Sequence, residues 1–225
     1  MKKLTFILLI LISFTNAEMI AQVASGGTSN RSVFKNIGAA DRNNTSNVFG
    51  SIGDWSTDLT ISEKTPAQAA ALWPGPDHNG MGATGWGSFT AGAYNRASGN
   101  GAFVGGFHNI AGPTGSDITS INGNSIGQTA FGYGTQATGN ASFSAGEGTE
   151  ASGSHGVVFG KNTVASGSFS TALGFETDAT DYGSFVIGSY NSSGSSATSA
   201  ASFSTSAPAF VIGNGTASNA KSDAF

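Results

Sequence analysis

A glycine that recurs at a 14-residue step is the feature that most restricts what this chain can fold into. In each repeat an apolar residue lies three places before the glycine, as in FSAG at Phe143–Gly146 and FVIG at Phe185–Gly188. The glycines that close these runs are Gly92, Gly106, Gly134, Gly146, Gly160, Gly174, Gly188 and Gly213. A fixed period of this kind indicates a stacked architecture, in which each unit buries its apolar surface against the next one.

The repeat is interrupted at three places. The step doubles between Gly106 and Gly134, falls short of the period between Gly134 and Gly146, and lengthens again between Gly188 and Gly213. We interpret these steps as two insertions and one deletion at the corners of a solenoid, where changes of length are tolerated.

Each unit contains two short runs, one of them alternating and one of the type found at Ala151–Gly153. In the alternating run, Phe185 and Ile187 point one way and Ser184 and Val186 the other, which is the period of a β-strand. Glycine at the end of a run permits the positive φ that a tight corner needs. A unit of this length suits one coil of two strands and two turns. The expected fold is therefore all-β, a parallel β-roll or β-solenoid of 14-residue repeats.

The apolar residues that keep step with the glycines are expected to form the buried core of the repeats. They are Phe89, Phe103, Phe131, Phe143, Val157, Phe185, Ile187 and Phe210. Disorder is the alternative that the 34 glycines suggest, together with abundant Ser, Thr and Asn. A flexible linker, however, has no reason to keep aromatic residues in register with glycine.

The N-terminus has the order of a secretory signal peptide. Two lysines precede the apolar run Leu4–Phe14, which is shorter than the roughly 20 residues that span a bilayer. Small residues then offer cleavage after Ala17 or after Ala21. We assign residues 1–21 to the signal peptide and expect no membrane span in the mature chain.

The remaining chain divides into three regions. Residues 22–85 are expected to form a cap and linker with a short helix at 66–73, since a proline suits the first helical position and solenoid ends need covering. Residues 86–218 carry the repeats, with an irregular insert at 111–127. Residues 219–225 are interpreted as the truncated continuation of another unit.

The segment Ala137–Gly188 resembles the head repeats of trimeric autotransporter adhesins, the YadA-like head family. The repeat of that family is Ser-x-Ala-x-Gly alternating with Ala-x-Gly, and it is carried best by Ser144–Gly146, Ala151–Gly153, Ala165–Gly167 and Ala172–Gly174. The resemblance implies a left-handed β-roll that assembles as a homotrimer and binds extracellular matrix, glycans or other surface ligands. Members usually continue into a coiled-coil stalk, and no heptads follow the repeats here. Similar repeats occur in phage-tail-fibre-like proteins, which keeps a purely structural role open.

No catalytic or metal-binding constellation is recognisable in the sequence. The three histidines, His78, His108 and His155, lie far apart, and His108 and His155 fall at predicted corners. The glycine-rich stretches have no lysine placed as in a phosphate-binding loop. The chain has no cysteine. We therefore expect no enzymatic activity, no cofactor and no metal.

Two weaker hypotheses concern acidic and threonine residues. Carboxylates in neighbouring repeats suggest a Ca²⁺ strip, but no coordinating loop surrounds them, and a solvated face is favoured; they are Glu147, Glu150, Glu176, Asp178 and Asp181. An ice-ordering threonine row is not expected, because we interpret Thr90, Thr135, Thr149, Thr163 and Thr177 as occupying different repeat positions. A net charge of −4 without basic clusters argues against nucleic acid as a partner. The sequence predicts a secreted, cell-surface, adhesin-like module.

Overall fold

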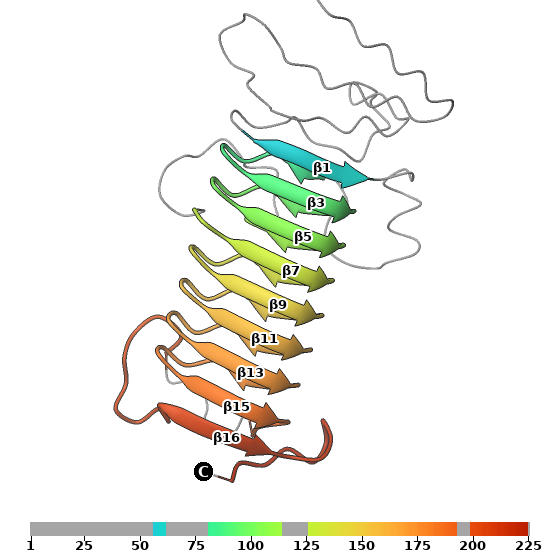
Figure 1. Cartoon of the computed structure of the whole chain (residues 1–225). Helices are drawn as coiled ribbons and strands as arrows, with labels where there is room; N and C mark the ends of the chain where they lie inside the picture. Colours follow the sequence, from blue (N-terminus) through green and yellow to red (C-terminus); the bar gives the residue numbers. More distant parts are fainter. Residues whose placement is uncertain (1–55, 62–80, 114–125, 193–198, 225) are drawn as a thin grey trace, which may run out of the picture.

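The described part of the chain is a parallel β-solenoid (Figure 1). The computed structural model describes residues 56–61, 81–113, 126–192 and 199–224. Each complete coil contains a long strand of five residues and a short strand of two residues, joined by turns. This confirms the predicted fold class. The predicted signal peptide and the predicted helix at 66–73 lie outside the described residues.

Two parallel sheets run the length of the stack. The long strands form a nine-stranded sheet: β1 (Thr57–Ile61), β3 (Phe89–Ala93), β5 (Phe103–Phe107), β7 (Thr129–Tyr133), β9 (Phe143–Glu147), β11 (Val157–Lys161), β13 (Thr171–Phe175), β15 (Phe185–Ser189) and β16 (Phe210–Asn214). The short strands form a seven-stranded sheet: β2 (Gly82–Ala83), β4 (Arg96–Ala97), β6 (Ile110–Ala111), β8 (Gln136–Ala137), β10 (Glu150–Ala151), β12 (Val164–Ala165) and β14 (Asp178–Ala179).

The strand register corrects the phase that the sequence suggested. Gly132, rather than Gly134, pairs with Gly106 on one side and with Gly146 on the other. The step from Gly132 to Gly146 therefore has the regular length of the repeat, and the predicted deletion is wrong. Gly134 instead lies in the turn after β7, with a φ of 64°. The sequence FGYG contains two glycines, and spacing alone does not tell which of them pairs with the glycines of the neighbouring strands.

The solenoid also differs from the prediction at both ends. β1 lies in the region assigned to cap and linker, yet it pairs in parallel with β3, so the coils begin before residue 86. After β16 the chain turns back, and Asp223 forms an antiparallel bridge with Gly213. The segment predicted to open another coil thus covers part of the edge of β16, where unpaired backbone groups would otherwise offer a template for association.

The core is built from small side chains. The alanine that ends each short strand is fully buried in every coil: Ala83, Ala97, Ala111, Ala137, Ala151, Ala165 and Ala179. The second residue of each long strand packs toward these alanines, as Val158 and Ala172 do in one buried cluster. A coil only two strands across leaves no room for aromatic side chains at these positions, and interiors are filled to close packing.

The predicted repeat core is therefore wrong for the single chain. Ser184 and Val186 are buried, whereas Phe185 and Ile187 are 36% and 39% exposed, so the predicted alternation is confirmed with the faces exchanged. The first and third residues of the long strands point outward. The predicted core residues thus lie on the outer side of the nine-stranded sheet: Phe103, Phe131, Phe185, Ile187 and Phe210 are exposed, and Phe89, Phe143 and Val157 are half-buried.

Seven of the eight glycines predicted at corners lie within long strands, and only Gly134 lies in a turn as predicted. At Gly160, the fourth residue of β11, φ is 136°, and a Cβ would overlap the carbonyl oxygen of Gly174 in the next coil. The same fourth position holds Gly92, Gly106, Gly132, Gly146, Gly174, Gly188 and Gly213. Only glycine permits the coils to approach this closely here.

A buried polar column accompanies these glycines, two residues after each long strand. Asn109 Nδ2 donates to the carbonyl of Gly132 at 2.8 Å, and Thr163 Oγ1 donates to that of Gly174 at 3.2 Å. The column consists of Asn95, Asn109, Thr135, Thr149, Thr163, Thr177 and Asn191, all buried. The threonines do form a regular row once the phase is corrected, but the row faces inward, where it satisfies backbone groups and cannot order external water.

Candidate binding surfaces

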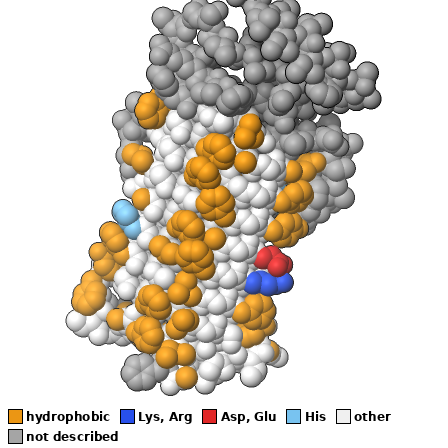
Figure 2. Space-filling view, in the orientation of Figure 1, with side chains coloured by type: hydrophobic (Ala, Val, Ile, Leu, Met, Phe, Trp, Pro, Cys, Tyr) orange, Lys and Arg blue, Asp and Glu red, His pale blue; other side chains and the backbone are white. Residues whose placement is uncertain are grey.

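The outer side of the nine-stranded sheet carries a continuous apolar band, which we call the aromatic face and which Figure 2 shows along the molecule. Its rings form a ladder between coils: the ring centroids of Phe89 and Phe103 are 4.5 Å apart, those of Phe103 and Phe131 5.3 Å, and those of Phe143 and Phe159 5.0 Å. The face is defined by the first and third residues of the long strands: Thr57, Leu59, Phe89, Ala91, Phe103, Gly105, Thr129, Phe131, Phe143, Ala145, Val157, Phe159, Thr171, Leu173, Phe185, Ile187, Phe210 and Ile212.

The aromatic face is shaped by close packing between coils, and it carries no charge. A Cβ on Gly105 would lie 2.9 Å from the ring of Phe131, so the glycine makes room for that ring. None of the residues that define the face is ionisable. Nine strands at a spacing of about 4.8 Å and a width of five residues give a band of roughly 600 Å². That equals the largest apolar patches of soluble monomers, which are frequently functional.

One edge of the solenoid follows the last residue of each long strand and the turn after it. Tyr94 stacks edge-on against Phe107, and Phe107 lies 5.7 Å from Tyr133. In the next two coils this edge is charged rather than aromatic, because Lys161 Nζ and Glu147 Oε1 form an ion pair of 2.9 Å. Both side chains are about half exposed, so the pair contributes little stability, roughly 0–1 kcal/mol.

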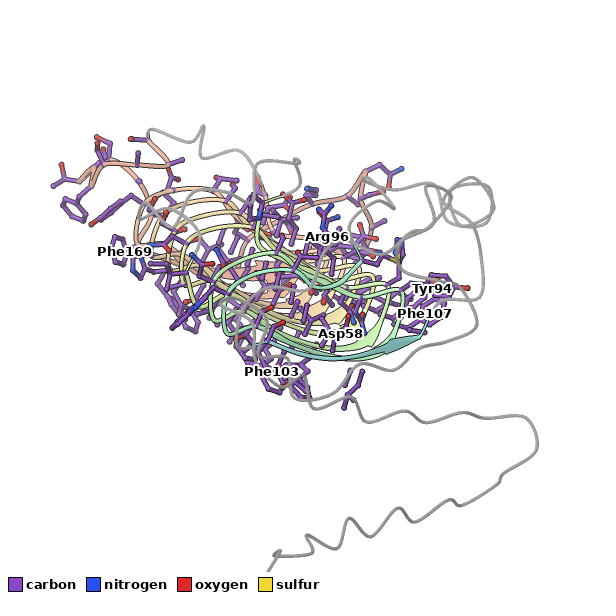
Figure 3. All side chains as sticks on the ribbon, turned by 90° about the horizontal axis from the view of Figure 1, so that it is seen from above. Asp58, Tyr94, Arg96, Phe103, Phe107 and Phe169 are labelled. Atoms are coloured by element: carbon purple, nitrogen blue, oxygen red, sulfur yellow. The ribbon has the colours of Figure 1, made fainter. Side chains whose placement is uncertain are left out.

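The opposite edge carries an aromatic corner, which we define as His155, Phe169 and Tyr182. Its first two rings are stacked with centroids 4.6 Å apart and an interplanar angle of 1°, and Tyr182 lies 5.3 Å from Phe169. Seen along the stack in Figure 3, Phe169 lies at the end of the coil opposite to Tyr94 and Phe107. This cluster was not predicted from the sequence. Its signal was available, since His155 and Phe169 are one repeat apart.

The acidic residues do not converge on one site. Glu147 pairs with Lys161, Asp178 Oδ2 lies 3.0 Å from Lys221 Nζ, and Asp181 is only 2% exposed. Glu150 and Asp178 share a repeat position two coils apart, as predicted. Within the described ranges, no group of three or more His, Asp or Glu side chains could hold a metal ion.

The histidines are equally dispersed. His108 and His155 both lie in turns, as predicted, with φ values of 58° and 59°. They belong to opposite edges of the coil, because His108 follows a long strand and His155 precedes one. His78 lies outside the described residues. The structure therefore brings neither of the two described histidines toward the other.

Comparisons with protein-family models, curated proteins and solved structures give no match to this chain. In the part of the chain that the structure describes, no helix is long and apolar enough to cross a membrane. The surfaces themselves, above all the aromatic face, are therefore the features that indicate a function.

Proposed function

We propose that this chain is an extracellular, non-enzymatic module of the adhesin-head type, which assembles through its aromatic face and presents its remaining surface to ligands. The observation that supports this proposal most strongly is the uncharged ladder of rings on the outer side of the nine-stranded sheet. The inner side of that sheet already packs against a core of small residues. Phe103 is 41% exposed and Phe159 is 46% exposed in the single chain. The N-terminal signal sequence supports export, and a site at the bacterial cell surface follows from the adhesin-head assignment.

The proposed assembly is a homotrimer with parallel subunits. The aromatic face runs along the whole stack, so copies placed side by side bury it over its full length. Three such faces would bury about 1,800 Å² in the closed trimer, or about 600 Å² for each pair of subunits, so stability would come from closing the ring rather than from any one pair. Closed rings of identical subunits satisfy such a surface without leaving a free end. The number three is supported by the resemblance to YadA-like head repeats.

The first experiment measures the oligomeric state of residues 22–225 by sedimentation, with far-UV circular dichroism as the test of folding. We expect a β-rich trimer for the natural sequence. Phe131→Lys places a charge in the middle of the aromatic face and should give a folded monomer. Gln136→Lys adds the same charge to the short-strand sheet of the same coil and should leave the trimer intact. A natural chain that stays monomeric at about 50 μM would overturn the assembly proposal, because specific interfaces have dissociation constants in the micromolar range or below.

The second candidate function is a structural segment of a phage-tail-fibre-like protein or another surface appendage, without a ligand of its own. The regular ladder of coils, covered at β16 by the returning chain, favours it. A binding screen of the trimer against matrix proteins and glycan arrays separates the two functions. Saturable binding of at least one ligand supports the adhesin-type module, whereas no binding to any ligand of the screen supports the structural role.

A further inference from the structure

We propose that the aromatic corner of His155, Phe169 and Tyr182 is a carbohydrate-binding site that takes the apolar face of a neutral pyranose ring. The proposal rests on the proposed function, for which it names both a site and a class of ligand. It concerns the edge of the solenoid that the assembly through the aromatic face leaves free.

The first argument is the open face of the imidazole. Two residues before the long strands, successive coils carry Gly127, Ala141, His155 and Phe169. One face of the His155 ring is covered by Phe169, with which it stacks in parallel. In the coil on the other side of His155, the corresponding position holds Ala141, whose side chain is a single methyl group. Coils are spaced by about 4.8 Å, so the missing ring leaves a ledge on which one further ring can stack.

The second argument is that the fold does not require rings at this corner. Phe169 has a φ of 60° and is 52% exposed, although a bulky residue in the left-handed region costs about 1 kcal/mol or more. The same turn position is occupied by Gly87, Gly101, Gly127 and Gly183, all at positive φ. Glycine would therefore fit without strain. Retaining an exposed aromatic residue in a strained conformation points to a role in binding.

The third argument is the chemistry around the rings. The residues three places before the long strands are Asn140, Ser154 and Ser168, and the Oδ1 of Asn140 accepts the backbone N–H of Ile126 at 3.0 Å. In the turns that precede these long strands, the only ionisable residues apart from His155 are Tyr182 and the buried Asp181. A neutral corner with hydroxyl and amide groups beside stacked rings suits a polyhydroxylated ligand with an apolar face. The same turns hold no Lys or Arg to neutralise phosphate, sulfate or an acidic chain.

Assembly would amplify such a site. A single ledge for one sugar ring binds weakly, on the order of 1 mM. A trimer presents three copies on its periphery, so a polymeric glycan that reaches more than one corner binds with higher avidity.

The test uses the mature protein and four probes: cellohexaose, mannohexaose, chitohexaose and a heparin hexasaccharide. Titration followed by saturation-transfer NMR should show at least one neutral probe binding through its ring C–H protons. Phe169→Gly should weaken that binding at least tenfold, since it removes the stacked ring. The same change should leave the melting temperature unchanged or raise it, because glycine relieves the positive φ. His155→Gly should behave similarly.

The matched control is Asn162→Gly, which relieves a φ of 51° at the opposite edge without removing a ring. It should bind the probes as the natural protein does. The proposal is overturned if no neutral probe binds at 10 mM (about ten times the weakest expected Kd), if Phe169→Gly binds undiminished, or if only the sulfated probe binds. Any of these results leaves the sedimentation experiment unaffected, so failure of the carbohydrate site is distinguishable from failure of the proposed assembly.

Discussion

Glycine serves two different purposes among the residues of this chain. In the long strands it permits close approach of neighbouring coils, as at Gly160, where a side chain would overlap the backbone of the next coil. In the turns it only eases a positive φ, as at Gly183, where nothing lies within 4 Å of an added Cβ. Five other turn positions that follow a long strand hold non-glycine residues at positive φ: Tyr94, His108, Asn162, Glu176 and Tyr190.

Gly160→Ala and Gly183→Ala should therefore differ sharply in stability. The first introduces both strain and a backbone overlap, and we expect a loss of about 4 kcal/mol or failure to fold. The second introduces strain alone, about 1 kcal/mol. Urea unfolding followed by circular dichroism measures both. Equal losses for the two variants would show that inter-coil approach is not the reason for glycine in the strands.

The buried side-chain amide of Asn109 is expected to stabilise the fold. Asn109 donates to the carbonyls of Gly105 and Gly132 and accepts from the backbone N–H and the Oγ1 of Thr135. Asn109→Ala leaves buried backbone groups unpaired, and we expect a loss of about 3 kcal/mol of unfolding free energy. Asn109→Thr introduces the residue that four other coils use in this column, so roughly half of that loss should be recovered. Chemical unfolding of the natural chain and the two variants measures these losses of unfolding free energy. If Asn109→Ala is as stable as the natural chain, the buried polar column does not stabilise the fold as described.

At the scale of strands, alternation was readable from the sequence but its direction was not. The pattern showed that Phe185 and Ile187 share a face opposite to Val186. Hydrophobicity then favoured the larger side chains as the core. The width of the coil decides otherwise, because the second position of the long strands accommodates no side chain larger than valine or aspartate. That width depends on pairing between distant residues, which a single repeat does not display.

The edge of β16 supplies a prediction at the same scale. The Asp223–Gly213 bridge and the N–H of Ala224, which donates to the carbonyl of Ile212 at 2.7 Å, occupy that edge. Removing residues 217–225 should expose it and cause end-to-end association, detectable as larger species in sedimentation. Lys221→Gln, which breaks the ion pair with Asp178 but keeps the backbone pairing, should cause none. A truncated chain that sediments like the intact one would show that the returning segment does not protect the edge.

The described part of the chain is a one-dimensional stack in which each coil contacts only its neighbours, so its length is adjustable in units of one coil. Deleting residues 157–170 joins Gly156 to Thr171 and keeps every column in register. We expect a folded protein whose urea m-value falls by roughly a tenth, in proportion to the surface lost. Deleting residues 157–168 instead misplaces the turns and should unfold the adjoining coils. Circular dichroism and urea unfolding separate the two outcomes, and comparable folding of both deletions would contradict the register.

Parallel stacking also determines how the molecule responds to force. The hydrogen bonds between neighbouring strands run along the long axis. Tension between the two ends therefore acts on every interface between coils at the same time. The bonds within one interface share the load, whereas the interfaces bear it in series, and the weakest interface opens first. Each released coil lengthens the chain by about 40 Å, the extended length of its residues less one strand spacing. A tethered module of this kind would absorb mechanical work in small, repeated steps.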